Sequence, residues 1–135
     1  MSEQDNVQTV RTAYAAFKKG DIPALLNLLA EDVTWIQPGQ TETIATAGER
    51  HGRQQVAQYF ALVNEIFEVE EFEPQEFIAA GDKVVVLGRY RRRLKATGHV
   101  DESDWVHLFT VRGDKIIAHR AYADTAATLA AFKAG

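Results

Sequence analysis

The sequence predicts an α+β fold in which three N-terminal helices pack on a curved, mainly antiparallel sheet. Apolar residues recur at helical spacing in much of the chain up to Phe67. From Glu68 onward they alternate with a period of two, which is typical of strands. Near the C-terminus, two runs rich in β-branched and aromatic residues flank Gly113-Asp114, a dipeptide suited to a tight hairpin turn.

The three predicted helices have recognisable ends. The first covers residues 5–19, and Gly20 can supply its left-handed C-cap. Asp21 is expected to cap a second helix that ends near residues 30–31. The third covers residues 53–67, where apolar side chains form one stripe.

Strands and one last helix account for most of the remaining chain. Residues 40–52 are polar and small, which predicts a long surface loop, and loops of this length often border binding sites. Pro74 lacks a backbone N–H, so the strand around it is expected at a sheet edge with a bulge. The other predicted elements are strands at 33–36, 84–95, 105–111 and 116–119, and a helix at 126–132.

Composition limits the class of protein. The 135 residues suit one domain, residues 1–135, with 46% apolar and 25% charged residues. The chain has no cysteine, no apolar run long enough for a membrane span and no signal-peptide pattern at its start, which together predict a cytoplasmic protein. A net charge of −4 argues against nucleic acid as a partner.

Two histidines in the predicted hairpin are candidates for chemistry, because an imidazole titrates near neutral pH. His107 is the stronger candidate, either as a proton-transfer group in a pocket or as a paired histidine inside the sheet. A plain two-residue hairpin pairs Val111 with Ile116, and His119 then faces away from His107. A bulge would reverse this orientation.

Several segments resemble the nuclear transport factor 2-like superfamily, especially its ketosteroid isomerase-related and SnoaL-like branches. The resemblance spans nearly the whole chain and rests on the order and spacing of short motifs. They include Ala30-Glu31-Asp32-Val33-Thr34-Trp35, Gly52-Arg53, Ala80-Gly81-Asp82 and the run Trp105 to Val111. The resemblance implies a cone-shaped α+β barrel with an apolar pocket, and a homodimer formed through the sheet.

The acid and base positions of the related enzymes are only partly retained. Ketosteroid isomerases use an aspartate base, a tyrosine and a protonated aspartic acid. These roles fall at Gln37, near Ala13 and at His107, and an amide at position 37 cannot accept a proton at neutral pH. The histidine of polyketide cyclases matches His107, but their aspartate falls at Ala121. The Arg-x-Asp of limonene epoxide hydrolase falls at residues 89–91, which read Arg-Tyr-Arg.

Other side chains are expected to contact a ligand or to fill the core. Trp35, Phe60 and Phe109 are the apolar candidates, and Gln37 and His119 are polar ones. Arg89 either holds a ligand carboxylate or lies on a solvated face, since arginines along this strand alternate between faces. The scattered histidines do not predict a metal site.

Two functions are consistent with the sequence. The first is binding of a small apolar or cyclic ligand, with cofactor-free isomerase, cyclase or lyase chemistry at His107. The second is a non-catalytic binding or interaction protein that keeps the pocket without the carboxylates of its relatives.

Overall fold

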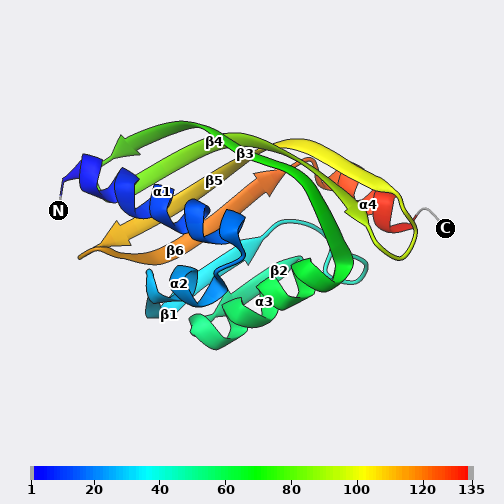
Figure 1. Ribbon diagram of the computed structural model, residues 1–135, viewed down its shortest axis with the longest axis horizontal. Helices are drawn as coiled ribbons and strands as arrows, with labels where there is room; N and C mark the ends of the chain where they lie inside the picture. Colours follow the sequence, from blue (N-terminus) through cyan, green and yellow to red (C-terminus); the bar gives the residue numbers. More distant parts are fainter. Residues whose placement is uncertain (1, 134–135) are drawn as a thin grey trace.

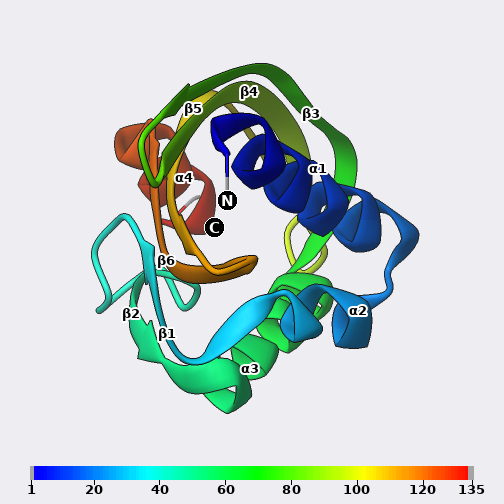
Figure 2. The same cartoon turned by 90° about the vertical axis from the view of Figure 1, so that its left-hand side faces the viewer.

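The computed structural model describes residues 2–133 and has one six-stranded sheet with helices against it. The strands lie in the order β2-β1-β6-β5-β4-β3, and only β1 and β6 pair in parallel. The sheet curls around α1, and α2 and α3 lie across its open side (Figure 2). The α+β prediction with a curved, mainly antiparallel sheet is therefore confirmed.

Helices α1 (Glu3–Lys19), α2 (Ile22–Asn27) and α3 (Gly52–Ile66) come before the long strands (Figure 1). The left-handed Gly20 ends α1, and Asp21 Oδ1 accepts from Ala24 N to cap α2. The prediction that the second helix reaches residues 30–31 is wrong. The chain turns into a strand at Leu29, because that fully buried side chain pairs with β6 in the core.

Strands β1 (Leu29–Gln37) and β2 (Gly48–His51) pair antiparallel at one side of the sheet. The first strand is therefore longer than residues 33–36, and the predicted loop at 40–52 contains a short edge strand. β3 (Phe67–Ala80) forms the opposite edge, and its pairing with β4 (Lys83–Leu94) shifts on either side of Pro74. This confirms the predicted edge position of Pro74.

The C-terminal hairpin consists of β5 (Val100–Arg112) and β6 (Lys115–Ala123). Val111 pairs with Ile116, but Thr110 pairs with Ala118, so one extra residue forms a bulge in β6. The bulge places His119 opposite Phe109 and settles the orientation that the sequence left open. Helix α4 (Thr125–Lys133) then covers the end of the sheet farthest from the N-terminus (Figure 1).

The core lies between the inner face of the sheet and the three N-terminal helices. It includes Val10 of α1, Val56 of α3, and Val84, Val86 and Ile116 of the sheet, all without exposed surface. Among residues 2–133, no helix is both long and apolar enough to cross a membrane.

Candidate functional site

A cavity of about 90 Å³ lies between α1, α3 and the curved sheet. Its apolar lining includes the aromatic rings of Phe17, Trp35, Phe60, Phe72 and Phe109. Its polar lining comes from Tyr14, Gln37, Tyr59, Tyr90, Arg92, His107 and His119. No aspartate or glutamate is among the described residues that line it.

Tyr14 and His107 form the central polar contact of the cavity. Tyr14 Oη lies 2.8 Å from His107 Nδ1, which is a hydrogen bond between α1 and β5. Burial raises the pKa of Tyr14 and lowers the pKa of His107 to about 3, so both groups are neutral at physiological pH. His107 keeps some accessible surface because it lines the cavity.

One proton is shared in this hydrogen bond. Its position determines whether Nε2 of His107 is a hydrogen-bond donor or an acceptor for a ligand. If Tyr14 donates to Nδ1, then Nε2 of His107 carries the N–H and is a donor. If Nδ1 carries the N–H, then Nε2 is a basic lone pair and the Tyr14 hydroxyl hydrogen is free to bond elsewhere. The pair can therefore present either a donor or an acceptor at Nε2 without any net charge.

His119 is the second imidazole of the cavity. Its ring stacks on Trp35 with centroids 3.8 Å apart, and its centroid lies 4.7 Å from that of His107. Burial, with a contribution from His107, lowers the pKa of His119 well below its ordinary value. Its Nδ1 is buried and has no hydrogen-bond partner among the described residues.

A smaller polar cavity of about 40 Å³ borders the first. Gln37, Tyr90, Arg92 and His107 line both spaces, so these four side chains form the wall between them. Ala121, the position where polyketide cyclases have an aspartate, lines only the smaller one. An open groove along α3 and β3 borders the main cavity on another side.

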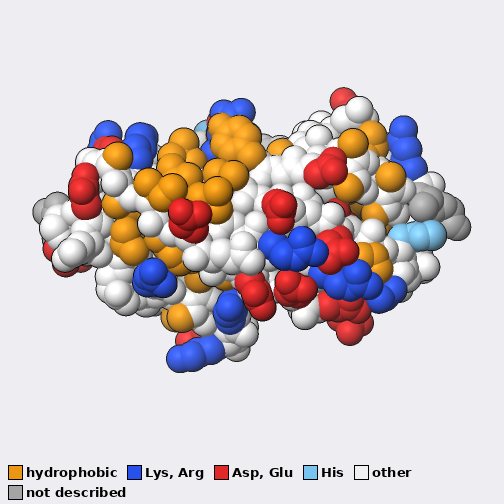
Figure 3. Space-filling model, turned by 90° about the horizontal axis from the view of Figure 1, so that it is seen from above, with side chains coloured by type: hydrophobic (Ala, Val, Ile, Leu, Met, Phe, Trp, Pro, Cys, Tyr) orange, Lys and Arg blue, Asp and Glu red, His pale blue; other side chains and the backbone are white. Residues whose placement is uncertain are grey.

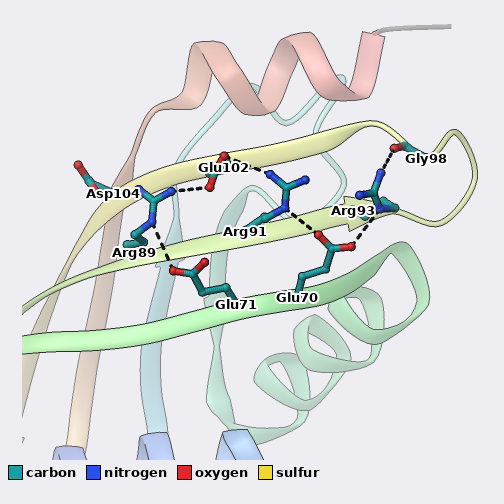
Figure 4. A network of polar contacts seen from close by, with 8 residues as sticks. All are labelled: Glu70, Glu71, Arg89, Arg91, Arg93, Gly98, Glu102 and Asp104. Carbon is teal, nitrogen blue, oxygen red and sulfur yellow. Dashed lines mark hydrogen bonds and ion pairs between the residues drawn. The ribbon is translucent and has the colours of Figure 1, made fainter.

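The structure brings six of the seven candidate side chains to the cavity. Arg89 is the exception, because it lies on the outer face of β4 in a network of ion pairs (Figure 4). It contacts Glu71, Glu102 and Asp104, and the neighbouring Arg91 contacts Glu70 and Glu102. The expectation that Arg89 holds a ligand inside the pocket is therefore wrong.

Sequence reasoning missed four polar residues of the cavity, namely Tyr14, Tyr59, Tyr90 and Arg92. Tyr14 lies one position beyond Ala13, near which the tyrosine of ketosteroid isomerases falls. The inward position of Arg92 can be inferred from the sequence. Strand alternation assigns Arg89, Arg91 and Arg93 to one face and leaves Arg92 alone on the other. That other face is the inner one.

Comparison with known proteins places the chain in a family. A model of the SnoaL-like domain matches residues 10–119, and the chain therefore belongs to the SnoaL-like family of the NTF2-like superfamily. No curated protein gives a significant match.

Solved structures agree with this assignment. An NTF2-like protein from Burkholderia xenovorans LB400 is 39% identical, with a TM-score of 0.90, over 98% of this chain and 99% of that chain. An NTF2-like protein of unknown function from Burkholderia pseudomallei K96243 is 30% identical, with a TM-score of 0.87 and the same coverage. TerC, crystallised with polyporic acid, is 26% identical, with a TM-score of 0.82, over 96% and 98% of the two chains.

Proposed function

We propose that this protein binds a small cyclic carbonyl compound in its cavity and that the His107–Tyr14 pair moves a proton next to the carbonyl group. The observation that carries the proposal is the 2.8 Å hydrogen bond between two neutral groups at the wall of an aromatic cavity. The family is one of ligand-binding isomerases and cyclases, and proton transfer beside a carbonyl group belongs to that class of chemistry.

A neutral imidazole is suited to this task in two ways. As a donor it polarises a carbonyl oxygen without bringing a charge into an apolar site. As an acceptor, Nε2 takes a proton from the carbon beside the carbonyl, and the electron pair of that C–H bond forms an enolate. The imidazolium and the enolate then have opposite charges, which raises the pKa of the histidine towards that of a usable base. Where the ligand has a C=C bond conjugated with the enolate, the electron pair shifts along it, and return of the proton to its far carbon completes an isomerisation.

The size of the cavity limits the ligand. About 90 Å³ is less than the roughly 150 Å³ of a cavity known to hold benzene. A ring therefore needs either outward movement of the lining or use of the adjoining smaller cavity. Phe17, Phe60 and Phe72 line both the cavity and the open groove, so movement of these rings would connect the two.

Hydrogen exchange at carbon tests the proposal without knowledge of the natural substrate. Cyclohexanone, 2-indanone and 2-tetralone in D₂O should take up deuterium beside the carbonyl faster with the protein than without it. His107→Ala should lower the protein-dependent rate by about 100-fold or more, the usual range for loss of an acid–base group. NMR spectroscopy measures the rate.

Matched variants define the control and the contradiction. Tyr14→Phe should reduce the rate by a smaller factor, because it removes the hydrogen bond but leaves the imidazole. His51→Ala should leave it unchanged, since His51 is an exposed histidine paired with Glu49. An exchange rate in His107→Ala equal to that of the unsubstituted protein would contradict the proposed role of His107.

A second function is favoured by one observation, the lack of a carboxylate among the described residues that line the cavity. In that case the protein binds its ligand and catalyses nothing. The same samples distinguish the two functions, because a purely binding protein shifts the NMR signals of a ketone or of polyporic acid without accelerating exchange.

A further inference from the structure

Arg92 is the one charged side chain among residues 2–133 that lines the cavity. It extends from the inner face of β4, and its guanidinium lies 3.9 Å from the centre of the Phe67 ring and 4.4 Å from that of Tyr90. Its side chain is only 16% exposed. A cation in such surroundings needs a specific partner, because burial of an isolated charge is costly.

Asp101 of β5 is that partner. Its Oδ2 accepts from Arg92 Nε at 3.0 Å and lies 2.8 Å from Nη2, so both contacts are made by one edge of the guanidinium. Thr128 of α4 donates to the same oxygen at 3.0 Å. The Asp101 side chain has no exposed surface. These contacts fix the orientation of Arg92 from behind the cavity wall.

The opposite edge of the guanidinium has no such partner. Arg92 Nη1 has no acceptor within the described part of the chain, although Arg92 lines both the main and the smaller cavity. The tyrosine hydroxyls nearby are neutral, because burial raises the pKa of Tyr14, Tyr59 and Tyr90, and the Tyr90 hydroxyl donates to Asp101 Oδ2. An ionised oxygen in the cavity would therefore meet the Arg92 guanidinium and no lining carboxylate.

We propose that Arg92 binds an acidic oxygen of the ligand, and that the ligand is a cyclic apolar acid, meaning a ring compound with a carboxylate, an enolised diketone or an acidic phenol. This inference rests on the proposed function, since it uses the same cavity. Arg92 supplies the charge-assisted hydrogen bond, and Asp101 acts as a positioning residue. The ring would lie among the aromatic side chains, within reach of His107.

Matched acid and amide pairs test this inference, because the two members differ in charge and little in shape. The probes are benzoate and benzamide, cyclohexanecarboxylate and its carboxamide, and 2-naphthoate and 2-naphthamide. Titration at pH 7 should show at least one acid bound about tenfold or more tightly than its amide, as expected for a charge-assisted hydrogen bond. Arg92→Met should abolish this preference.

Two further variants separate binding from folding. Arg92→Met leaves Asp101 buried without its cation, so the double variant Arg92→Met/Asp101→Asn removes that charge and should also show no preference for acids. Arg112→Met is the matched control, because Arg112 pairs with Asp82 on the surface. It should keep the full preference for acids.

The outcomes distinguish this inference from the proposed function. Equal binding of acids and amides by the unsubstituted protein contradicts the role of Arg92 and leaves the carbonyl chemistry of His107 untouched. A preference for acids that survives in the double variant also contradicts it. Binding of none of the six probes overturns the inference, whereas the proposed function is decided separately by deuterium uptake of the ketones.

Discussion

His107 lies among aromatic rings, and this environment determines its chemistry. Its ring stacks on Trp105 with centroids 3.9 Å apart. The ring centroids of Phe72 and Phe109 lie 6.3 Å and 6.1 Å from that of His107. Its one hydrogen bond to a described residue goes to a tyrosine and not to a carboxylate. Burial disfavours the imidazolium, and no hydrogen bond to a carboxylate within residues 2–133 offsets this, so the neutral form dominates.

The buried histidines predict that stability falls under mild acid. The folded-state pKa of His107 is about 3, below its ordinary value of 6.5, so between these values the unfolded chain binds more protons than the folded one. The free energy of unfolding should fall by about 1.4 kcal/mol for each pH unit below 6.5 through His107. His119 acts in the same direction.

Urea unfolding at pH 7 and pH 5 measures this effect. The loss of stability between the two values should be about 2 kcal/mol smaller in His107→Gln than in the unsubstituted protein. An equal loss in both proteins would show that His107 does not titrate in this range. The measurement stops at pH 5 because below it the carboxylates of the unfolded chain begin to bind protons, near their ordinary pKa of about 4.

Gly88 leaves space for Trp105, whose ring stacks on His107. A Cβ at this position would lie 2.3 Å from Trp105 Cζ2 and 2.5 Å from the Glu73 carbonyl oxygen, so a side chain must displace the indole or the neighbouring strand. Gly88→Ala should lower the free energy of unfolding by about 1–3 kcal/mol. It should also change the near-UV circular dichroism of the tryptophans. Unaltered stability and spectrum would contradict the close packing.

At the scale of elements, pattern and turn chemistry predicted most of the fold. Helical spacing located α1 and α3, Pro74 marked an edge strand, and Gly113-Asp114 marked the hairpin. The end of α2 was missed because Leu28 and Leu29 continue an apolar helical pattern, whereas pairing with β6 turns Leu29 into strand. Tertiary pairing thus outweighed local preference.

The candidate site was predicted less completely than the fold, and the reason is geometric. Whether His119 faces the cavity depends on one bulged residue, which local sequence does not reveal. Tyr14 meets His107 only because the sheet curls over α1, and that approach joins residues far apart in the chain. Strand alternation, in contrast, was enough to separate Arg92 from its neighbours.

At the scale of the whole molecule, the outer face of the sheet carries exposed apolar side chains. Ile78 and Tyr122 are 49% and 47% exposed, and Leu87, Val106 and Tyr122 line a shallow groove. Figure 3 shows a patch of apolar side chains left of centre on the face viewed from above, with charged side chains around it and a cluster of both signs to its right. An apolar patch beside charged side chains of both signs suits contact with a second copy of the chain.

We therefore expect a homodimer formed through this face. Size-exclusion chromatography with light scattering should give about twice the chain mass of 15.0 kDa. Tyr122→Glu should shift the protein towards the monomer, because it places a charge in the apolar contact, whereas Lys133→Glu on α4 should not. A single species of one chain mass for the unsubstituted protein would contradict the expected dimer.

The bulge in β6 has a consequence for redesign. Ile117 is the residue without a partner in β5, while Ile116 and Ala118 pair with consecutive positions. A chain lacking Ile117 can therefore keep His119 opposite Phe109, but with a straighter strand, because bulges add bend and twist. The curvature of β6 and the identity of the side chains that it presents to the cavity are thus separable. Deletion of Ile117 should change the volume of the cavity while the same side chains line it. A crystal structure of the deletion variant with His119 facing outward would refute this.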